Sequence, residues 1–229
     1  MDLLLFLFRG QEPAVLSDIS EKMNIPILWL LIMAGCLVIN LEYPLKDLTS
    51  EGLQILIRSR SRRTWYLSKC VWNIVSCACY MLFISLTAGV YILFTGGRLS
   101  ADVTAEIGYA VFGTVIDDEL SLTAGQALTI AVVLPFLTLC AFSMVQMILC
   151  FVMKPVNSFL VCFMGVLLSV YWSQGFVLGN GAMAVRSAVI ADGGTPAIMS
   201  VIVALSVIVV SGLVGGVLFQ HYDILKIGE

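Results

Sequence analysis

The sequence has 229 residues, of which 60% are hydrophobic and only 12% are charged. This composition leaves too little polar surface to cover a soluble globule, so it predicts an integral membrane protein. The net charge of −3 is spread over the loops and indicates neither a nucleic-acid-binding protein nor an acidic tail. The length suits a single helical membrane domain over residues 1–229.

The chain begins with the apolar run MDLLLFLFRG, which is too short to cross a membrane. It also lacks the basic start and the small-residue cleavage site of a secretory signal. Two interpretations stay open. The run either dips into the outer leaflet, or it is the outer end of a first helix that related chains possess.

Five apolar stretches approach or exceed the roughly 20 residues that a helix needs to cross the hydrocarbon core. They cover residues 26–42, 70–95, 128–153, 157–177 and 197–220. Charged side chains occur only near their ends, which argues against a proton-coupled carrier or an ion pump. The predicted fold is therefore an all-α integral membrane bundle of five transmembrane helices.

The loop over residues 43–69 is the most basic part of the chain, because half of all Lys and Arg residues lie between Lys46 and Lys69. Within it, Leu53, Leu56 and Ile57 form an apolar stripe at helical spacing. The stripe predicts a short amphipathic helix over about 49–58 on the membrane surface. Its N-cap candidates are Asp47, Thr49 and Ser50.

The distribution of Lys and Arg predicts the orientation, since these residues favour cytoplasmic loops. The basic loop is expected inside, together with the turn 154–157 and the tail 221–229. The remaining segments are acidic or nearly neutral and are expected outside: residues 1–25, 96–127 and 178–196. This arrangement puts the N-terminus outside and the C-terminus in the cytoplasm.

No catalytic, cofactor or metal site is predicted. The sequence contains no GxxxxGK[ST] phosphate loop, no HExxH zinc helix and no GxSxG nucleophile elbow. The seven cysteines lie within or at the edges of apolar stretches, where small buried hydrophobic residues are expected. The chain is therefore not expected to be an enzyme on its own.

Two interpretations of the basic loop follow. It is either a topology anchor that binds anionic headgroups at about 1 kcal/mol per charge, or a coupling helix that docks on a cytosolic ATPase. A single helix with a basic flank does not decide between them.

A resemblance to a known family is carried by the run EGLQILIRSRSRRTWYLSKCVW, which follows YPLKDL. These residues resemble the cytoplasmic loop in permease subunits of bacterial type-2 ABC exporters, especially those of Gram-positive bacteria. Two later runs agree: VLPFLTLCAFSMVQMILCFVMKPVNSFL resembles the fourth and fifth spans with their inner turn, and GNGAMAVRS resembles the segment before the last span.

The resemblance implies a six-span permease of the bacterial plasma membrane, of which this chain holds the equivalents of spans two to six. The missing first span is a departure from the family. A separate ABC ATPase would supply ATP hydrolysis and bind ATP and Mg, and a second permease subunit would complete the pathway. The implied ATPase contacts are Glu51, Gly52, Gln54, Arg58, Arg60, Arg62 and Arg63.

The apolar walls suit export of an apolar or amphipathic cargo, such as a peptide, a lipid or a drug-like molecule. Gln146 and Gln174 are the candidate pathway residues. In the last span, Gly212 and Gly216 match the GxxxG pattern that allows close helix approach. The alternative function is a non-transporting scaffold or accessory subunit. A neighbouring gene for an ABC ATPase would favour the exporter.

Overall fold

The structure is a computed structural model that describes residues 1–12, 25–48, 61–96, 122–191 and 193–222. The regular elements in these ranges are helical, as predicted. They are α1 (Asp2–Leu7), α2 (Ile27–Ile39), α3 (Tyr43–Leu48), α5 (Arg62–Phe94), α7 (Ala124–Leu128), the π-helix η1 (Thr129–Val133), α8 (Leu134–Val152), α9 (Pro155–Tyr171), the 3₁₀ turns η2 (Leu178–Ala182) and η3 (Ala184–Arg186), and α10 (Ala197–His221).

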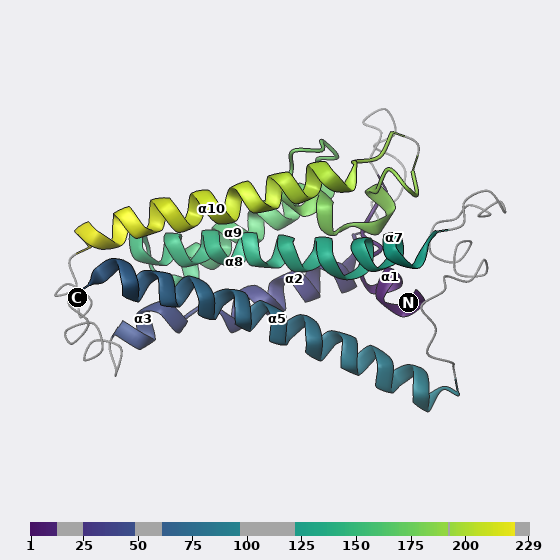
Figure 1. The fold of residues 1–229 in the computed structure, drawn as a ribbon, viewed down its shortest axis with the longest axis horizontal. Helices are drawn as coiled ribbons and strands as arrows, with labels where there is room; N and C mark the ends of the chain where they lie inside the picture. The colour runs from purple at the N-terminus through teal and green to yellow at the C-terminus, as the bar shows by residue number, and fades with distance from the viewer. Residues whose placement is uncertain (13–24, 49–60, 97–121, 192, 223–229) are drawn as a thin grey trace.

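The longer helices run side by side between two ends of an elongated bundle (Figure 1). One end holds α3, the start of α5 and the end of α10, while α1 and α7 lie at the other. Three helical segments are long and apolar enough to cross a membrane: Arg62–Phe94, Ala124–Val152 and Ala197–His221. The helices α2 and α9 are apolar but shorter, with 13 and 17 residues. The chain therefore has three candidate membrane spans among the described residues, and a helix also occupies each of the other two predicted stretches.

The segment 124–152 forms the centre of the bundle. In its most apolar stretch of 18 residues, 61% of the residues are buried, against 17% in the corresponding stretches of α5 and α10. The widened turn η1 ends at Val133, two positions before Pro135, which has no N–H to donate to the carbonyl of Ala131. A π turn is one way in which a helix absorbs such a lost hydrogen bond. The helix thus continues through the proline and keeps α8 packed against its neighbours.

The outer surfaces of α5 and α10 are apolar. Phe83 and Leu86 on α5 and Ile202 on α10 are each about three-fifths exposed. Such a large contiguous apolar surface is unfavourable in water and suits the hydrocarbon core of a bilayer. It agrees with the membrane class that the composition predicts.

Close packing of α5 against α10 depends on one glycine. Tyr66 on α5 is fully buried, and its hydroxyl donates to the carbonyl of Ser211 at 3.1 Å. A methyl group at Gly215 would overlap this hydroxyl, and Gly216 faces the same ring. A methyl group at Gly212 would meet nothing within 4 Å. The close approach therefore occurs within the chain at Gly215 and not at Gly212, the first glycine of the GxxxG pattern.

The N-terminal run packs into the protein. Leu5 and Phe8 are fully buried. The amides of Ala184 and Val185 donate to the carbonyls of Phe8 and Arg9 at 2.8 and 3.1 Å. These bonds attach the segment that contains α1 to the turns that precede α10.

Candidate functional site

The predicted coupling helix over 49–58 lies outside the described residues, and so do Glu51, Gly52, Gln54, Arg58 and Arg60. The structure does describe the two segments that flank the basic loop. One is α3, which leads into the loop, and the other is the first part of α5, which leads out of it. The candidate site is the base of the loop, where these two segments meet.

The helix α5 begins at Arg62, earlier than the predicted start of the span at residue 70. The hydroxyl of Ser61 caps this helix by accepting from the amide of Thr64 at 3.3 Å. Trp65 and Tyr66 are buried on its first two turns. The extra turns therefore carry the helix out of the predicted span and into the basic loop.

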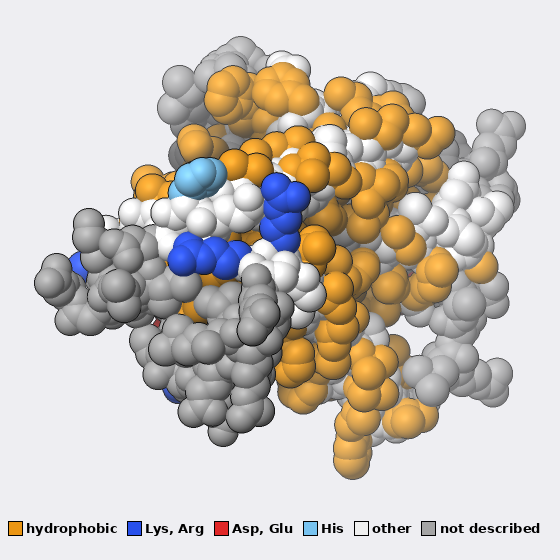
Figure 2. Space-filling view, turned by 60° about the vertical axis from the view of Figure 1, so that its left-hand side comes forward, with side chains coloured by type: hydrophobic (Ala, Val, Ile, Leu, Met, Phe, Trp, Pro, Cys, Tyr) orange, Lys and Arg blue, Asp and Glu red, His pale blue; other side chains and the backbone are white. Residues whose placement is uncertain are grey.

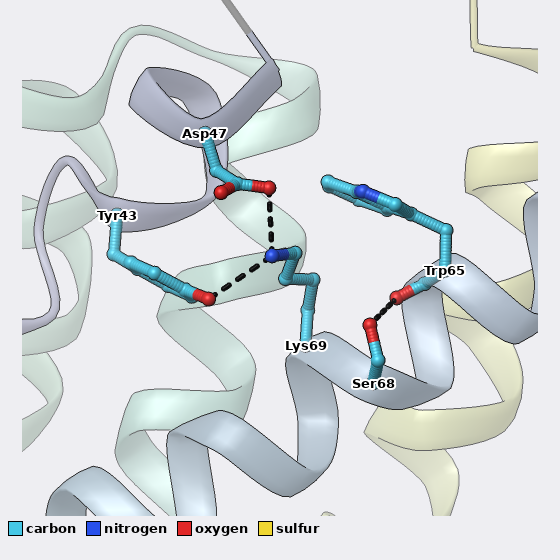
Figure 3. Close-up of polar contacts among 5 residues, drawn as sticks. All are labelled: Tyr43, Asp47, Trp65, Ser68 and Lys69. Carbon is cyan, nitrogen blue, oxygen red and sulfur yellow. Dashed lines mark hydrogen bonds and ion pairs between the residues drawn. The ribbon is translucent and has the colours of Figure 1, made fainter. Parts of the chain in front are cut away.

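An ion pair joins the two sides of the loop (Figure 3). The ammonium of Lys69 lies 2.6 Å from a carboxylate oxygen of Asp47 on α3 and donates to the hydroxyl of Tyr43 at 3.0 Å. The two charged side chains are only 12% and 24% exposed. This partial burial makes the ion pair stronger than an ordinary surface pair. Asp47 lies within α3, while the predicted helix over 49–58, for which it is an N-cap candidate, lies outside the described residues.

Aromatic rings enclose the ammonium of Lys69. It lies 5.0 Å from the centroid of the Tyr43 ring and 5.1 Å from that of Trp65, within the range of cation–π attraction. Tyr43 stacks on Trp72 with a centroid separation of 5.4 Å. We refer to Tyr43, Asp47, Trp65 and Lys69 as the loop clamp. It fastens α3 to α5 next to the two ends of the basic loop.

The same end of α5 is also attached to α10. Arg62 donates to the carbonyls of Gln220 and Tyr222 at 3.1 and 2.7 Å, and Arg63 donates to the side-chain oxygen of Gln220 at 3.3 Å. The last carbonyls of a helix have no partner within it and carry partial negative charge, so a cation stabilises them. The rings of Trp65 and Phe219 stack here, with centroids 4.6 Å apart.

Arg62 and Arg63 were predicted as contacts for an ATPase or for lipid. The structure places both side chains against the end of α10, although both remain exposed. Figure 2 shows Lys and Arg side chains at this end of the molecule, beside the hydrophobic sides of the bundle. Lys154 at the start of α9 is exposed as well.

The two predicted pathway glutamines are not brought together. Gln146 is fully buried in α8, and its amide donates to the carbonyl of Leu37 on α2 at 3.0 Å. Its side-chain oxygen and the hydroxyl of Ser143 have no hydrogen-bond partner among the described residues. Gln174 is exposed and lies beyond the end of α9. Only Gln146 therefore lies in the interior of the bundle.

A buried arginine organises the opposite end. Arg186 is 2% exposed and donates to the carbonyls of Ser169 and Val170, near the end of α9, at 2.6 and 2.5 Å. It also donates to the side chain of Asn180 and, at 2.9 Å, to the carbonyl of Gln11. Burial lowers the pKa of Arg186 to about 10, which still leaves it charged at neutral pH. The helix end supplies the partial negative charge that offsets this cation.

No group of three or more His, Cys, Asp or Glu residues that could hold a metal ion occurs in the described ranges. All seven cysteines are free, and only Cys79 is exposed. The burial of the other six cysteines agrees with the cysteine pattern of the sequence, in which the thiols lie in apolar stretches.

Sequence reasoning missed the loop clamp and the role of Arg186. The sequence pattern indicates Asp47 only as a candidate helix cap and Lys69 only as one of the basic residues. A signal was present for Arg186, because it is the one charged side chain in the run GNGAMAVRS. A lone charge in an apolar segment must be paired or hydrogen-bonded if the segment is buried.

No curated protein and no solved structure is significantly similar to the chain. A family model described as "protein of unknown function (DUF2705)" matches residues 4–225. The matched region includes the loop clamp, the central segment 124–152 and Arg186. The chain belongs to the DUF2705 family.

Proposed function

We propose that this chain is the membrane subunit of an ATP-binding cassette exporter and that its basic loop couples it to a separate ATPase. The observation that carries this proposal is the ion pair between Lys69 and Asp47 at 2.6 Å. A loop that only marks the cytoplasmic side needs positive charge, but it does not need its two flanks to be fastened together. A loop that transmits force does need a rigid base.

The mechanism follows from the attachments of the loop clamp. Two ATPase subunits would close around ATP and Mg and draw the loops of two permease subunits together. Because Lys69 holds Asp47, a displacement of the loop moves α3 and α5 as one unit. Arg62 passes the displacement to α10 through the carbonyls of Gln220 and Tyr222. The chain contributes the transport pathway and the clamped loop that transmits the movement, and the partner contributes ATP hydrolysis.

In this proposal α2 and α9 also cross the bilayer, which gives the five spans that the sequence predicts. The loop clamp faces the cytoplasm of a bacterial cell, and α1 lies at the outer end. The cargo is apolar or amphipathic, because the interior of the bundle is lined mainly by apolar residues. Gln146 is the polar pathway residue, while Gln174 lies on the surface at the outer end.

Co-purification tests the proposal. The chain is expressed with an ABC ATPase encoded beside it, and the complex is isolated in nanodiscs and assayed for ATP hydrolysis. We expect Glu51→Arg and Gly52→Trp to dissociate or uncouple the ATPase, because both changes alter the docking surface of the loop. The control is Gln174→Arg, which adds charge at the opposite end and should leave the complex intact.

A complex that forms and hydrolyses ATP equally well after both loop changes would show that the loop does not couple the subunits. If no ATPase is encoded nearby or bound, the result favours the alternative of a non-transporting scaffold.

A further inference from the structure

Two thiols from different helices meet in the core of the bundle. The sulfur atoms of Cys36 on α2 and Cys77 on α5 are 3.8 Å apart, although the residues are 41 positions apart in the sequence. Their side chains are 1% and 0% exposed. Cys36 and Cys77 are therefore in direct contact across the interface of α2 and α5.

Neighbouring amides orient this pair. The thiol of Cys77 donates to the side-chain oxygen of Asn73 at 3.7 Å, and the side-chain nitrogen of Asn40 donates to the sulfur of Cys36 at 3.8 Å. Both asparagines are buried. Cys150 differs from this pair because its sulfur lies 3.0 Å from the hydroxyl of Ser158. A cysteine that serves only to fill space needs no such thiol partner.

We propose that Cys36 and Cys77 are a redox-sensitive pair whose oxidation to a disulfide joins α2 to α5. The sulfur atoms must approach by about 1.8 Å to reach the length of a disulfide bond. The two thiols lose two electrons and two protons, and one S–S bond replaces two S–H bonds. The acceptor is a two-electron, hydrogen-accepting oxidant that enters the bilayer, of the class that includes quinones and diazenes.

Burial determines which oxidants can reach the pair. Thiol oxidation requires access as well as reactivity, so buried thiols resist oxidants that stay in bulk water. The apolar outer surface of α5 faces hydrocarbon, where an apolar or membrane-permeant oxidant can accumulate. The disulfide would lie deeper in the bundle than the loop clamp and would join α5 to α2, whereas the clamp joins α5 to α3. It would lock this interface irrespective of whether an ATPase binds the loop.

The experiment uses the full chain in phospholipid vesicles treated with the diazene diamide, which becomes a hydrazine when it takes up two hydrogens. The protein is then denatured, its free thiols are alkylated, and its peptides are analysed by mass spectrometry without reduction. We expect the number of free thiols to fall by two from the initial seven. We expect one linked peptide pair, which contains Cys36 and Cys77 and disappears after reduction.

The matched control is Cys79→Ser, which removes the exposed thiol two positions from Cys77 and should leave the linked pair unchanged. Cys36→Ser and Cys77→Ser should each abolish it. The decisive measurement uses the unaltered chain, so it stands even if a variant does not fold. The proposal is overturned if all seven thiols remain free, if Cys77 links to Cys140 instead, or if the product is a Cys79 disulfide between two copies.

Discussion

At the scale of single residues, the packing of α5 against α10 depends on the absence of one side chain. Tyr66 fits beside Gly215 and donates to the carbonyl of Ser211 at 3.1 Å. A methyl group added at Gly212, on the same helix, would contact no other atom. Two glycines on one helix thus have different roles, and the difference comes from what each one faces.

We expect Gly215→Ala to destabilise the protein by about 1–3 kcal/mol, because the added methyl group overlaps the Tyr66 hydroxyl and forces the ring to move. Gly212→Ala is the matched control. It should be neutral or stabilising by up to about 1 kcal/mol, because alanine favours a helix more than glycine does. Thermal unfolding in detergent, followed with a thiol-reactive dye, measures both effects. Equal midpoints for the two variants would contradict this explanation.

At the scale of the elements, the loop clamp makes α3 and the start of α5 one structural unit. Asp47 and Tyr43 come from α3, and Trp65 and Lys69 come from α5. A six-residue helix such as α3 is marginal in isolation, so the contacts of the clamp with α5 help to hold it in place.

We predict that Lys69→Met and Asp47→Asn each destabilise the protein by about 1–2 kcal/mol, since each change removes a partly buried ion pair. Their effects should not add, because either change alone already breaks the same interaction. Thermal unfolding of the two single variants and the double variant gives the coupling energy. Strict additivity would show that Lys69 and Asp47 do not stabilise the protein together.

At the scale of the whole molecule, the two ends of the bundle differ in charge and in how they are built. Exposed Arg62, Arg63 and Lys154 lie at the end that holds α3. The opposite end is organised by the buried Arg186 and by the docked N-terminal run. By the positive-inside rule, we expect the first of these ends to face the cytoplasm.

This orientation predicts which positions a membrane-impermeant maleimide can label in intact cells. We expect Gln174→Cys to be labelled, because this exposed position lies at the outer end. Lys154→Cys, which is exposed at the basic end, should be labelled only after the cells are permeabilised. The opposite pattern would mean that the proposed orientation is inverted.

Much of the helical architecture follows from the sequence, because apolar composition and length determine where a membrane helix can form. Segments of helix occupy all five predicted apolar stretches, and three of them reach candidate span length. The start of α5 at Arg62 was not predicted. It depends on the Ser61 cap and on the burial of Trp65, which hydropathy does not report.

The candidate site was less predictable, because its contacts join residues that are distant in the sequence. Asp47 and Lys69 lie in different helices, one on each side of the basic loop. The periodicity of a single helix therefore cannot relate the two residues. Cys36 and Cys77 likewise come from different helices. In the sequence, Gln146 and Gln174 differ from their apolar neighbours only in polarity, and only the packing of the helices distinguishes a buried amide from an exposed one.

The central claim, that the base of the basic loop is a mechanical joint, is tested most directly by ATP hydrolysis in the Lys69→Met complex. The variant leaves the proposed docking residues of the loop unchanged, so the ATPase should still bind. Because α3 and α5 would no longer move together, we predict that cargo-stimulated hydrolysis is lost. The control is Lys154→Met, which removes a lysine from the same end but not from the clamp. A Lys69→Met complex with normal cargo-stimulated hydrolysis would contradict the claim.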